Sequence, residues 1–346
     1  MEDKNSNKQT RQQTTIADIA KLAGVSVSTV SRVLNNSTEV SKTTKKKILK
    51  LIKEYDYTPS ELARGLVTKT SKTIGLLIPN LLNPYYVELI ESIEKFVSSQ
   101  GFSLFLCITD AKEEKEKYYI NEMLRRRTNG LVMLSTNIKD HDLIKKVKKS
   151  MEIVSVEADI EDVDKISVTN EKGTYDVINH LIEYGHKDIA FIGYRFSLSG
   201  LQQRFTGYQR AMEEHSIPIR PEYVIEGEGT GNSGYTMTQR LLELPNPPTA
   251  IHCMNEHLAV GTYLAINEYG LRIPQDISVT AFDNLASSNI LKPRLTTAAM
   301  PIREMGEAAA DLLIRNILEG SKQVKQEIIF STKLILREST RRLDCP

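Results

Sequence analysis

The sequence has no tryptophan, few aromatic residues and only three cysteines, Cys107, Cys253 and Cys345. The three lie far apart and lack the close spacing of metal ligands, which argues against a disulfide framework and against a structural metal site. Cysteines used in this way are typical of a reducing compartment. We therefore expect a protein that needs no metal or other cofactor.

Long hydrophobic runs are also missing. Residues 1–13 are polar, without the apolar segment of a secretory signal, and no later apolar run is long enough to span a membrane. These absences argue against secretion and against a membrane partner. The sequence predicts a cytoplasmic protein that begins with a disordered arm over 1–13.

The charge is unevenly distributed along the 346 residues, a length that suits two or three domains. The net charge is +1, yet residues 1–72 contain 14 Lys and Arg against 7 Asp and Glu, and the remaining residues contain 31 against 37. A basic amino-terminal module on an acidic body predicts a head that binds a polyanion.

The stretch from Thr15 to Asn35 has the pattern of two short helices joined by a turn. Helical spacing places four apolar residues on one face of the first helix: Ile16, Ile19, Ala20 and Ala23. Gly24 then supplies a turn conformation that glycine reaches at little cost. The buried side of the second helix is expected to be Val30, Val33 and Leu34. This pattern predicts a helix-turn-helix, whose second helix enters the DNA major groove.

A third helix and a weak fourth one are expected next. Ser41 is predicted to cap a helix that runs to about Tyr55 and turns four residues inward: Ile48, Leu49, Ile52 and Tyr55. Pro59 opens a short segment that Gly65 weakens, so this segment should fold only with outside support. We expect a helix-turn-helix domain over 14–58, and a hinge helix and linker over 59–72.

From Thr73 onward, apolar runs of strand length alternate with amphipathic helical stretches. The predicted strands are Ile74–Ile78, Leu104–Ile108, Leu131–Leu134, Ile153–Val156, Ile189–Ile192, Ala250–Met254 and Ile277–Phe282. Alternation of this kind favours parallel sheets built from βαβ units, and the number of strands favours two doubly wound sheets. The predicted fold class is α/β, with an all-α head.

A possible enzyme signature lies at 229–234, where Gly-Thr-Gly-Asn-Ser-Gly satisfies G-x-G-x-x-G after a possible strand at Tyr223–Glu226. A single match of this kind is weak, and no ribose-binding acid follows it, so we interpret it as a flexible loop. Nucleophile-elbow, P-loop and zinc-protease motifs are absent. His252 and His257 are five residues apart across a strand end, which does not favour a metal site. We predict that the protein is not an enzyme.

The order of these parts resembles the lactose-repressor (LacI/GalR) family of bacterial transcription regulators. The resemblance runs from Thr15 to about Thr340, and its carriers include Thr15–Asn35, Tyr57–Leu66, Ile74–Pro79, Asn83–Tyr86, His180–His186, Ile273–Ser278 and Leu295–Thr297. It implies a hinge helix after the head and a core of two subdomains, like sugar-binding periplasmic proteins. The expected core is 73–340, with one subdomain over 73–169 and 299–327 and the other over 170–298 and 328–340. The family is usually dimeric, so we expect a homodimer.

The resemblance also implies how the head contacts double-stranded operator DNA. Val27 and Ser28 match positions that touch base edges, although both are small and can offer one methyl contact and one hydroxyl hydrogen bond. Leu66, with Ala63 beside it, matches the hinge that enters the minor groove and opens the central base step. The remaining expected contacts are Thr15, Ser26, Thr29, Ser31, Arg32 and Asn35.

An effector site is implied between the two core subdomains, at the carboxyl ends of the strands. The matching residues are Asn83, Tyr85, Tyr86, Arg204, Asn255 and Asp283. Their side chains suit a polyol, since the carboxylate and amide accept or share hydroxyl protons and Arg204 donates in a fork. We expect a small-molecule effector, a sugar or a sugar derivative.

Several residues depart from the family pattern. Glu256 stands where the family usually has aspartate, and Thr169 stands where an aspartate before Asn170 is common. Glycine near Gly229 replaces an aromatic residue that purine-responsive relatives use to sandwich a base, which disfavours a purine. The loop Tyr194–Leu201 carries no feature that we assign to a ligand.

The sequence thus predicts a dimeric transcriptional repressor that an effector controls. The alternatives are a cytoplasmic sugar-binding module or an α/β enzyme with no role on DNA. The sequence leaves open whether the effector releases the DNA or promotes its binding, and whether a corepressor protein takes part.

Overall fold

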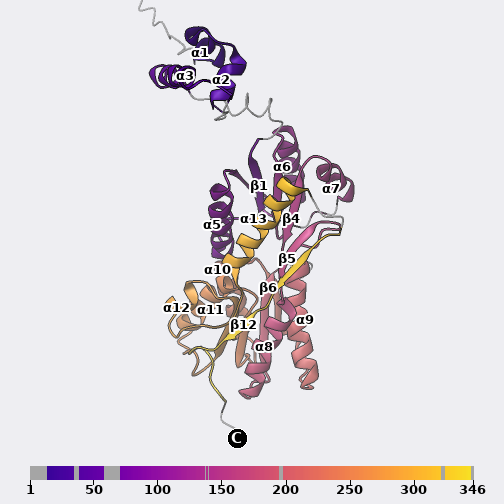
Figure 1. Ribbon diagram of the computed structural model, residues 1–346. Coiled ribbons are helices and arrows are strands. Elements are labelled where there is room, and N and C mark those ends of the chain that lie inside the picture. Colours follow the sequence, from indigo (N-terminus) through magenta and orange to yellow (C-terminus); the bar gives the residue numbers. More distant parts are fainter. Residues whose placement is uncertain are drawn as a thin grey trace, which may run out of the picture. The chain divides into compact units, whose positions relative to one another are not determined.

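The computed structural model describes residues 14–34, 39–57, 71–136, 138, 140–194, 198–320 and 324–343. Contacts divide the chain into two units, Met1–Ser71 and Lys72–Pro346. Figure 1 draws both units. Within the described ranges, no helix combines the length and the apolar character that a membrane span requires.

The first unit contains three helices around a small apolar core. They are α1 (Ile16–Ala23), α2 (Val27–Leu34) and α3 (Lys42–Glu54). Thr15 and Asp18 cap α1 reciprocally, and Gly24 ends it with a φ of 70° in the left-handed region. The buried residues of this core are Ile19, Ala20, Ala23, Val30, Val33 and Ile48.

The predicted inward face of α3 is partly wrong. Ile48 is wholly buried, but Leu49 and Tyr55 are 46% and 42% exposed. Leu51 and Tyr57 pack against the core in addition to Ile52. α3 contacts both α1 and α2, and among its described residues these contacts bury Ile48 alone, so its buried stripe is narrower than a full amphipathic face.

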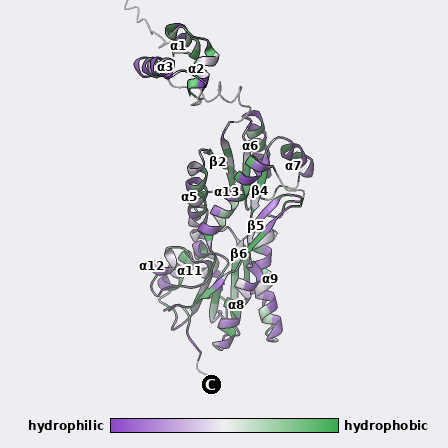
Figure 2. Ribbon diagram, viewed as in Figure 1, coloured by the Kyte–Doolittle hydropathy of each residue, from purple (hydrophilic) through white to green (hydrophobic). Residues whose placement is uncertain are grey.

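The first sheet of the second unit is wholly parallel and has the strand order β11-β5-β4-β3-β1-β2. Its strands are β1 (Thr73–Ile78), β2 (Ser103–Ile108), β3 (Gly130–Leu134), β4 (Glu152–Val156), β5 (Asp164–Val168) and β11 (Glu327–Phe330). The helices that alternate with them are α5 (Pro84–Ser99), α6 (Glu113–Arg125), α7 (His141–Lys148) and α13 (Ile302–Glu319). In Figure 2 the strands are mostly green and the outer helices largely purple, as expected for a sheet buried on both faces.

The second sheet has the order β12-β10-β9-β8-β6-β7, and β12 alone among these described strands runs antiparallel to its neighbour. Its strands are β6 (Ile189–Tyr194), β7 (Val224–Gly227), β8 (Ala250–Cys253), β9 (Ser278–Asp283), β10 (Thr296–Ala299) and β12 (Lys333–Ile335). The accompanying helices are α8 (Asn170–Glu183), α9 (Ser199–Glu214), α10 (Gly231–Leu242), α11 (Glu256–Glu268) and α12 (Ser287–Ile290), with a 3-10 turn η1 at Pro221–Tyr223.

The chain passes between the two sheets more than once. β5 leads into α8 at Thr169, and β11 leads into β12 around Thr332. The hydroxyl of Thr169 lies 2.9 Å from that of Thr332, and the Thr332 amide donates to Thr169 Oγ1 at 3.0 Å. Since β11 stays in the first sheet through Phe330, this last crossing comes later than the expected boundary at 327–328.

The segment that resembled a nucleotide-binding loop is not a flexible loop. Gly231 and Gly234 belong to α10, which Thr230 caps through the amide of Ser233. A Cβ at Gly234 would lie 2.1 Å from the carbonyl oxygen of Leu258, and one at Gly261 would lie 1.7 Å from that of Gly231. These glycines therefore allow α10 and α11 to pack backbone against backbone.

Candidate functional site

The exposed surface of α2 carries most of the residues predicted to contact DNA. Ser26, Val27, Ser28 and Arg32 are exposed, while Thr29 and Ser31 are half-buried. The hydroxyl of Ser26 lies 2.8 Å from that of Ser28 and accepts from the Thr29 amide at 3.2 Å. Ser26 thus caps the start of α2, and Val27 is left as an exposed apolar side chain, 45% accessible.

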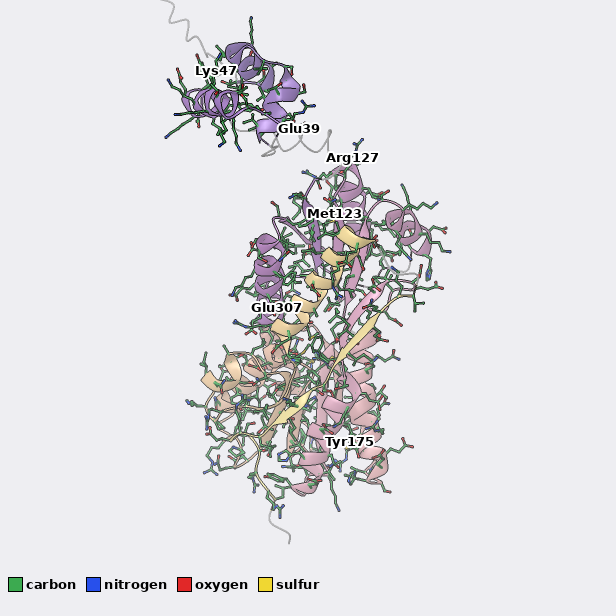
Figure 3. The ribbon with its side chains drawn as sticks, in the orientation of Figure 1. Glu39, Lys47, Met123, Arg127, Tyr175 and Glu307 are labelled. Carbon is green, nitrogen blue, oxygen red and sulfur yellow. The ribbon has the colours of Figure 1, made fainter. Side chains whose placement is uncertain are left out.

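The charge around this surface is mainly positive. α3 presents exposed lysines, including Lys47, which Figure 3 labels on the head. Arg32 Nε lies 3.4 Å from the Glu39 carboxylate, and both side chains are more than half exposed. A pair this exposed contributes at most about 1 kcal/mol, so Arg32 can exchange Glu39 for a phosphate.

Three predicted DNA contacts lie outside the described residues, namely Asn35, Ala63 and Leu66. Thr15 is described, and its hydroxyl donates to Asp18 Oδ2 at 2.6 Å. This hydrogen bond holds the cap of α1. A phosphate contact by Thr15 remains a prediction, as do the contacts of the hinge.

The six predicted effector residues lie together around one cavity in the core. Asn83, Tyr85 and Tyr86 come from the start of α5, whereas Arg204, Asn255 and Asp283 come from α9, from the end of β8 and from β9. Asn83 and Asn255 are themselves the caps of α5 and α11. Asn83 accepts from the Tyr85 amide at 3.1 Å, and Asn255 accepts from the Leu258 amide at 2.8 Å.

Arg204 is held in one orientation by its neighbours. Its Nε donates to Asn170 Oδ1 at 2.8 Å, and its Nη1 donates to the Met254 carbonyl at 2.8 Å and to Asp283 Oδ1 at 3.2 Å. The guanidinium carbon also lies 3.7 Å from the ring centroid of Phe282. A buried guanidinium fixed in this way is a preorganised donor for a polar ligand.

Asp283 is almost completely buried, which raises the pKa of its carboxyl to about 7 although the nearby Arg204 guanidinium opposes the shift. The carboxyl can therefore accept or donate a hydrogen bond near neutral pH. Such a group suits a ligand whose hydroxyls both donate and accept.

Glu157 is a site residue that the sequence analysis missed. It follows β4 directly, lines the cavity, and accepts from the Val168 amide at 2.9 Å and from Asn170 Nδ2 at 2.6 Å. Desolvation raises the pKa of its carboxyl, and Arg204 lowers it in part. Its position immediately after a predicted strand is the signal that could have identified it, since that position was used for Asp283.

The start of α9, which falls in the segment 194–201 that was assigned no ligand contact, also contributes to the cavity. Leu198, Gly200 and Leu201 line the cavity together with Ser135. A Cβ at Gly200 would lie 2.7 Å from Glu157 Oε2, so glycine leaves room for that carboxylate. Leu198, Gly200 and Leu201 thus contribute space and apolar surface to the cavity. A search of the sequence for polar ligand-binding residues does not identify them.

Two polar atoms at the cavity are buried without a partner in the described part of the chain, Tyr85 Oη and Asn255 Nδ2. Buried polar groups nearly always have a hydrogen-bond partner, so such atoms at a cavity are ready for a ligand. The inner cavity, of about 30 Å³, adjoins an outer one of about 260 Å³ that shares Asn83, Tyr86, Ser135 and Leu198 with it. The outer cavity reaches Gly227–Thr230 and His257.

A helix-turn-helix head and a core with a polar cleft between two doubly wound sheets define a ligand-binding DNA regulator. The comparisons agree. Residues 15–60 match the family described as bacterial regulatory proteins, lacI family, and residues 178–340 match a periplasmic binding protein-like domain. The chain belongs to the lacI family, whose members are DNA-binding transcriptional regulators and not enzymes.

Individual relatives match along nearly the whole chain. The HTH-type transcriptional repressor PurR of Actinobacillus pleuropneumoniae is 35% identical over 333 residues, which cover 95% of this chain and 99% of the relative. The lac repressor dimer bound to operator and the anti-inducer ONPF is 27% identical, with a TM-score of 0.84. The match covers 95% of this chain and 100% of the lac repressor chain. A lacI-family regulator from Enterococcus faecium with bound ribose is 28% identical, with a TM-score of 0.71. The match covers 79% of this chain and 100% of that regulator.

Proposed function

We propose that the protein is a cytoplasmic, dimeric repressor that binds operator DNA and changes its affinity when a sugar or sugar derivative enters the core cleft. The observation that carries the effector part is the convergence of Arg204, Asp283 and Glu157 beside the unpartnered Tyr85 Oη and Asn255 Nδ2. This set offers a fixed fork of donors and several oxygen acceptors around one cavity, as a ligand rich in hydroxyls requires.

Two of the related structures contain a small molecule, ONPF in one and ribose in the other, which supports a small-molecule effector for this chain. A planar purine fits the described cleft less well. Gly229 in the outer cavity offers no ring, and Tyr85 and Tyr86 come from the same helix. A ring sandwiched between two aromatic walls would need a second aromatic side chain facing them.

A homodimer is supported by the lac repressor dimer and by exposed apolar side chains on the core. Val87 on α5, Leu264 on α11 and Ile290 on α12 are 48%, 52% and 73% exposed. α11 packs against α12, and the starts of α5 and α11 line one cavity, so these helices belong to neighbouring parts of the core. Covering such side chains stabilises a dimer by the hydrophobic effect.

On DNA, two heads would occupy successive major grooves, while the hinge residues Ala63 and Leu66 would enter the minor groove between them. Small side chains at Val27 and Ser28 read few base edges. Sequence preference would then depend strongly on the hinge and on DNA shape.

The proposal is tested by incubating the full-length protein with randomised duplex DNA at a stated salt concentration and sequencing the retained fraction. Enrichment of a near-palindrome is expected. The selection is repeated with D-ribose, other sugars and purine bases present in separate arms, and a sugar should change the retained fraction. Response to a purine alone would overturn the sugar assignment. Enrichment only after a bacterial extract is added would point to a corepressor protein and contradict control by the effector alone.

A further inference from the structure

Glu256 is the first residue of α11 and is wholly buried, yet it is not a predicted ligand contact and does not line either cavity. Its carboxylate instead accepts three hydrogen bonds from the segment that follows β9. The Leu285 amide donates to Oε2 at 2.8 Å, the Ser288 hydroxyl to Oε2 at 2.6 Å, and the Ser287 hydroxyl to Oε1 at 2.5 Å. A buried carboxylate with this many donors is strongly held.

The segment held by Glu256 begins in an unusual backbone conformation. Asp283 has a φ of 112° and Asn284 a φ of 69°, and neither is glycine. Residues with a side chain adopt such values only at an energetic cost, and they keep them only where surrounding contacts enforce the conformation. Two of them in succession at a ligand site therefore need an anchor on both sides.

Contacts on both sides of the strained pair are present. The side chains of the pair are each held by an arginine. Arg204 Nη1 donates to Asp283 Oδ1 at 3.2 Å, and Arg337 Nη2 donates to Asn284 Oδ1 at 2.6 Å. After the pair, the Leu285 amide is tied to Glu256, whose own backbone amide faces Asp283 Oδ2 at 3.5 Å. Glu256 thus contacts the strained pair through its backbone amide and the segment after the pair through its carboxylate.

We propose that Glu256 is a positioning residue of the effector site, which holds Asp283 in its left-handed conformation with the carboxylate beside Arg204. The inference rests on the proposed effector function of the cleft. An aspartate at this position would hold its carboxylate one carbon closer to α11, so we expect it to lose at least one of the contacts with Leu285, Ser287 and Ser288.

The first test needs no ligand. Hydrogen exchange is measured by mass spectrometry on full-length Glu256→Ala, Glu256→Asp and Glu256→Gln, with Glu268→Gln on the exposed end of the same helix as the matched control. The alanine and aspartate variants should exchange at least about tenfold faster over 284–291, since protection follows local opening. Glutamine should keep most of the protection, because its oxygen accepts from Leu285 and the serine hydroxyls can accept from its amide.

Unchanged exchange over 284–291 in the alanine and aspartate variants would overturn the proposal. So would faster exchange spread equally over β8, β9 and α11, which indicates a general loss of stability. In a crystal structure of Glu256→Ala, the φ of Asp283 should lie outside the left-handed region. In Glu256→Gln, it should stay inside that region.

The second test uses D-ribose as the probe, titrated calorimetrically into the same four variants and the unchanged protein. Glu256→Asp should lose at least about tenfold in affinity while Glu268→Gln keeps it. If the unchanged protein binds neither D-ribose nor any other sugar, the sugar assignment fails, and the exchange experiment still decides the role of Glu256.

Discussion

The guanidinium of Arg204 and the carboxylate of Asp283 form a buried ion pair, with Nη1 and Oδ1 3.2 Å apart and both side chains less than a tenth exposed. The two residues come from α9 and β9, which are far apart in the sequence. The free-energy cost of removing two charges from water exceeds the electrostatic attraction within such a pair unless further hydrogen bonds satisfy the buried groups. We attribute these further hydrogen bonds to the proposed ligand, because Tyr85 Oη and Asn255 Nδ2 nearby have no hydrogen-bond partner among the described residues.

Replacing Asp283 with asparagine should remove effector binding and leave DNA binding intact. The change keeps the shape but removes the carboxylate that pairs with Arg204, and truncating a buried hydrogen-bonded charge pair costs about 2–5 kcal/mol. We expect a loss of at least about 30-fold in effector affinity by calorimetry. Normal effector affinity in Asp283→Asn would show that the pair does not contact the ligand.

Effector affinity should also depend on pH through Asp283. Its pKa of about 7 means that the carboxyl gains a proton as the pH falls below neutrality. If the ligand binds the carboxylate, affinity should fall by up to about tenfold per pH unit below 7, the limit for uptake of one proton. Titrations at pH 8, 7 and 6 test this, with Asp283→Asn as the control that should show no such slope. A flat profile in the unchanged protein would contradict the ionised role.

Stability should fall in mild acid because of His186. Burial lowers the pKa of this histidine to about 4, so the unfolded state binds the proton more tightly between pH 6.5 and 4. The linked loss is about 2 kcal/mol by pH 5. The raised pKa of Asp283 has the opposite effect, because the folded state binds that proton more tightly and gains stability as the pH falls. The contribution of His186 is therefore measured by comparing a His186 variant with the unchanged protein.

The measurement is denaturant unfolding at pH 7.5 and pH 5. His186→Gln should lose less stability between these values than the unchanged protein, since glutamine does not titrate. His215→Gln, at an exposed histidine, should behave like the unchanged protein. Equal losses in all three would contradict the assignment to His186.

Close packing of α10 on α11 predicts different costs for neighbouring glycines. Gly234→Ala would place a methyl 2.1 Å from the Leu258 carbonyl oxygen, and overpacking of this kind costs about 1–3 kcal/mol. Gly231→Ala is the matched control, because its nearest contact would be an ordinary 3.5 Å. Thermal unfolding should separate the two, and equal melting temperatures would contradict the packing account.

Leu66→Ala should weaken binding to the selected operator more than binding to random duplex. A leucine that unstacks the central base step contributes only where the DNA accepts the deformation. Gel-shift titrations on both duplexes at one salt concentration provide the comparison. Equal losses on the two would contradict the wedge role.

Much of the fold follows from sequence periodicity, and the exceptions have physical causes. The strand at Asp164–Val168 was missed because its five residues include Asp164, Lys165 and Ser167, so no continuous apolar run announces it. It is nevertheless inner in its sheet, between β4 and β11. Asp164 is buried there and accepts from Asn316 and from the Gln326 amide, contacts that sequence spacing cannot reveal.

The predicted site was incomplete for a similar reason. Polar residues after strands or at helix starts, such as Asp283 and Asn255, are visible in the sequence because the apolar run stops at them. Glu157 obeys the same rule, since it follows the predicted strand Ile153–Val156, but it is not among the positions that the family resemblance marks. Leu198 and Gly200 contribute shape alone, which depends on tertiary packing and not on a local pattern.

The central claim is that a ligand in the core cleft changes operator affinity, and fluorescence anisotropy tests it directly. The selected operator is titrated with full-length protein at fixed salt, with and without the sugar that binds best, for the unchanged protein and Asp283→Asn. We expect a shift of about 5- to 150-fold in operator Kd for the unchanged protein, the usual range of allosteric coupling, and no shift for the variant. An equal shift in both proteins, or a sugar bound in the cleft that leaves operator Kd unchanged, would contradict it.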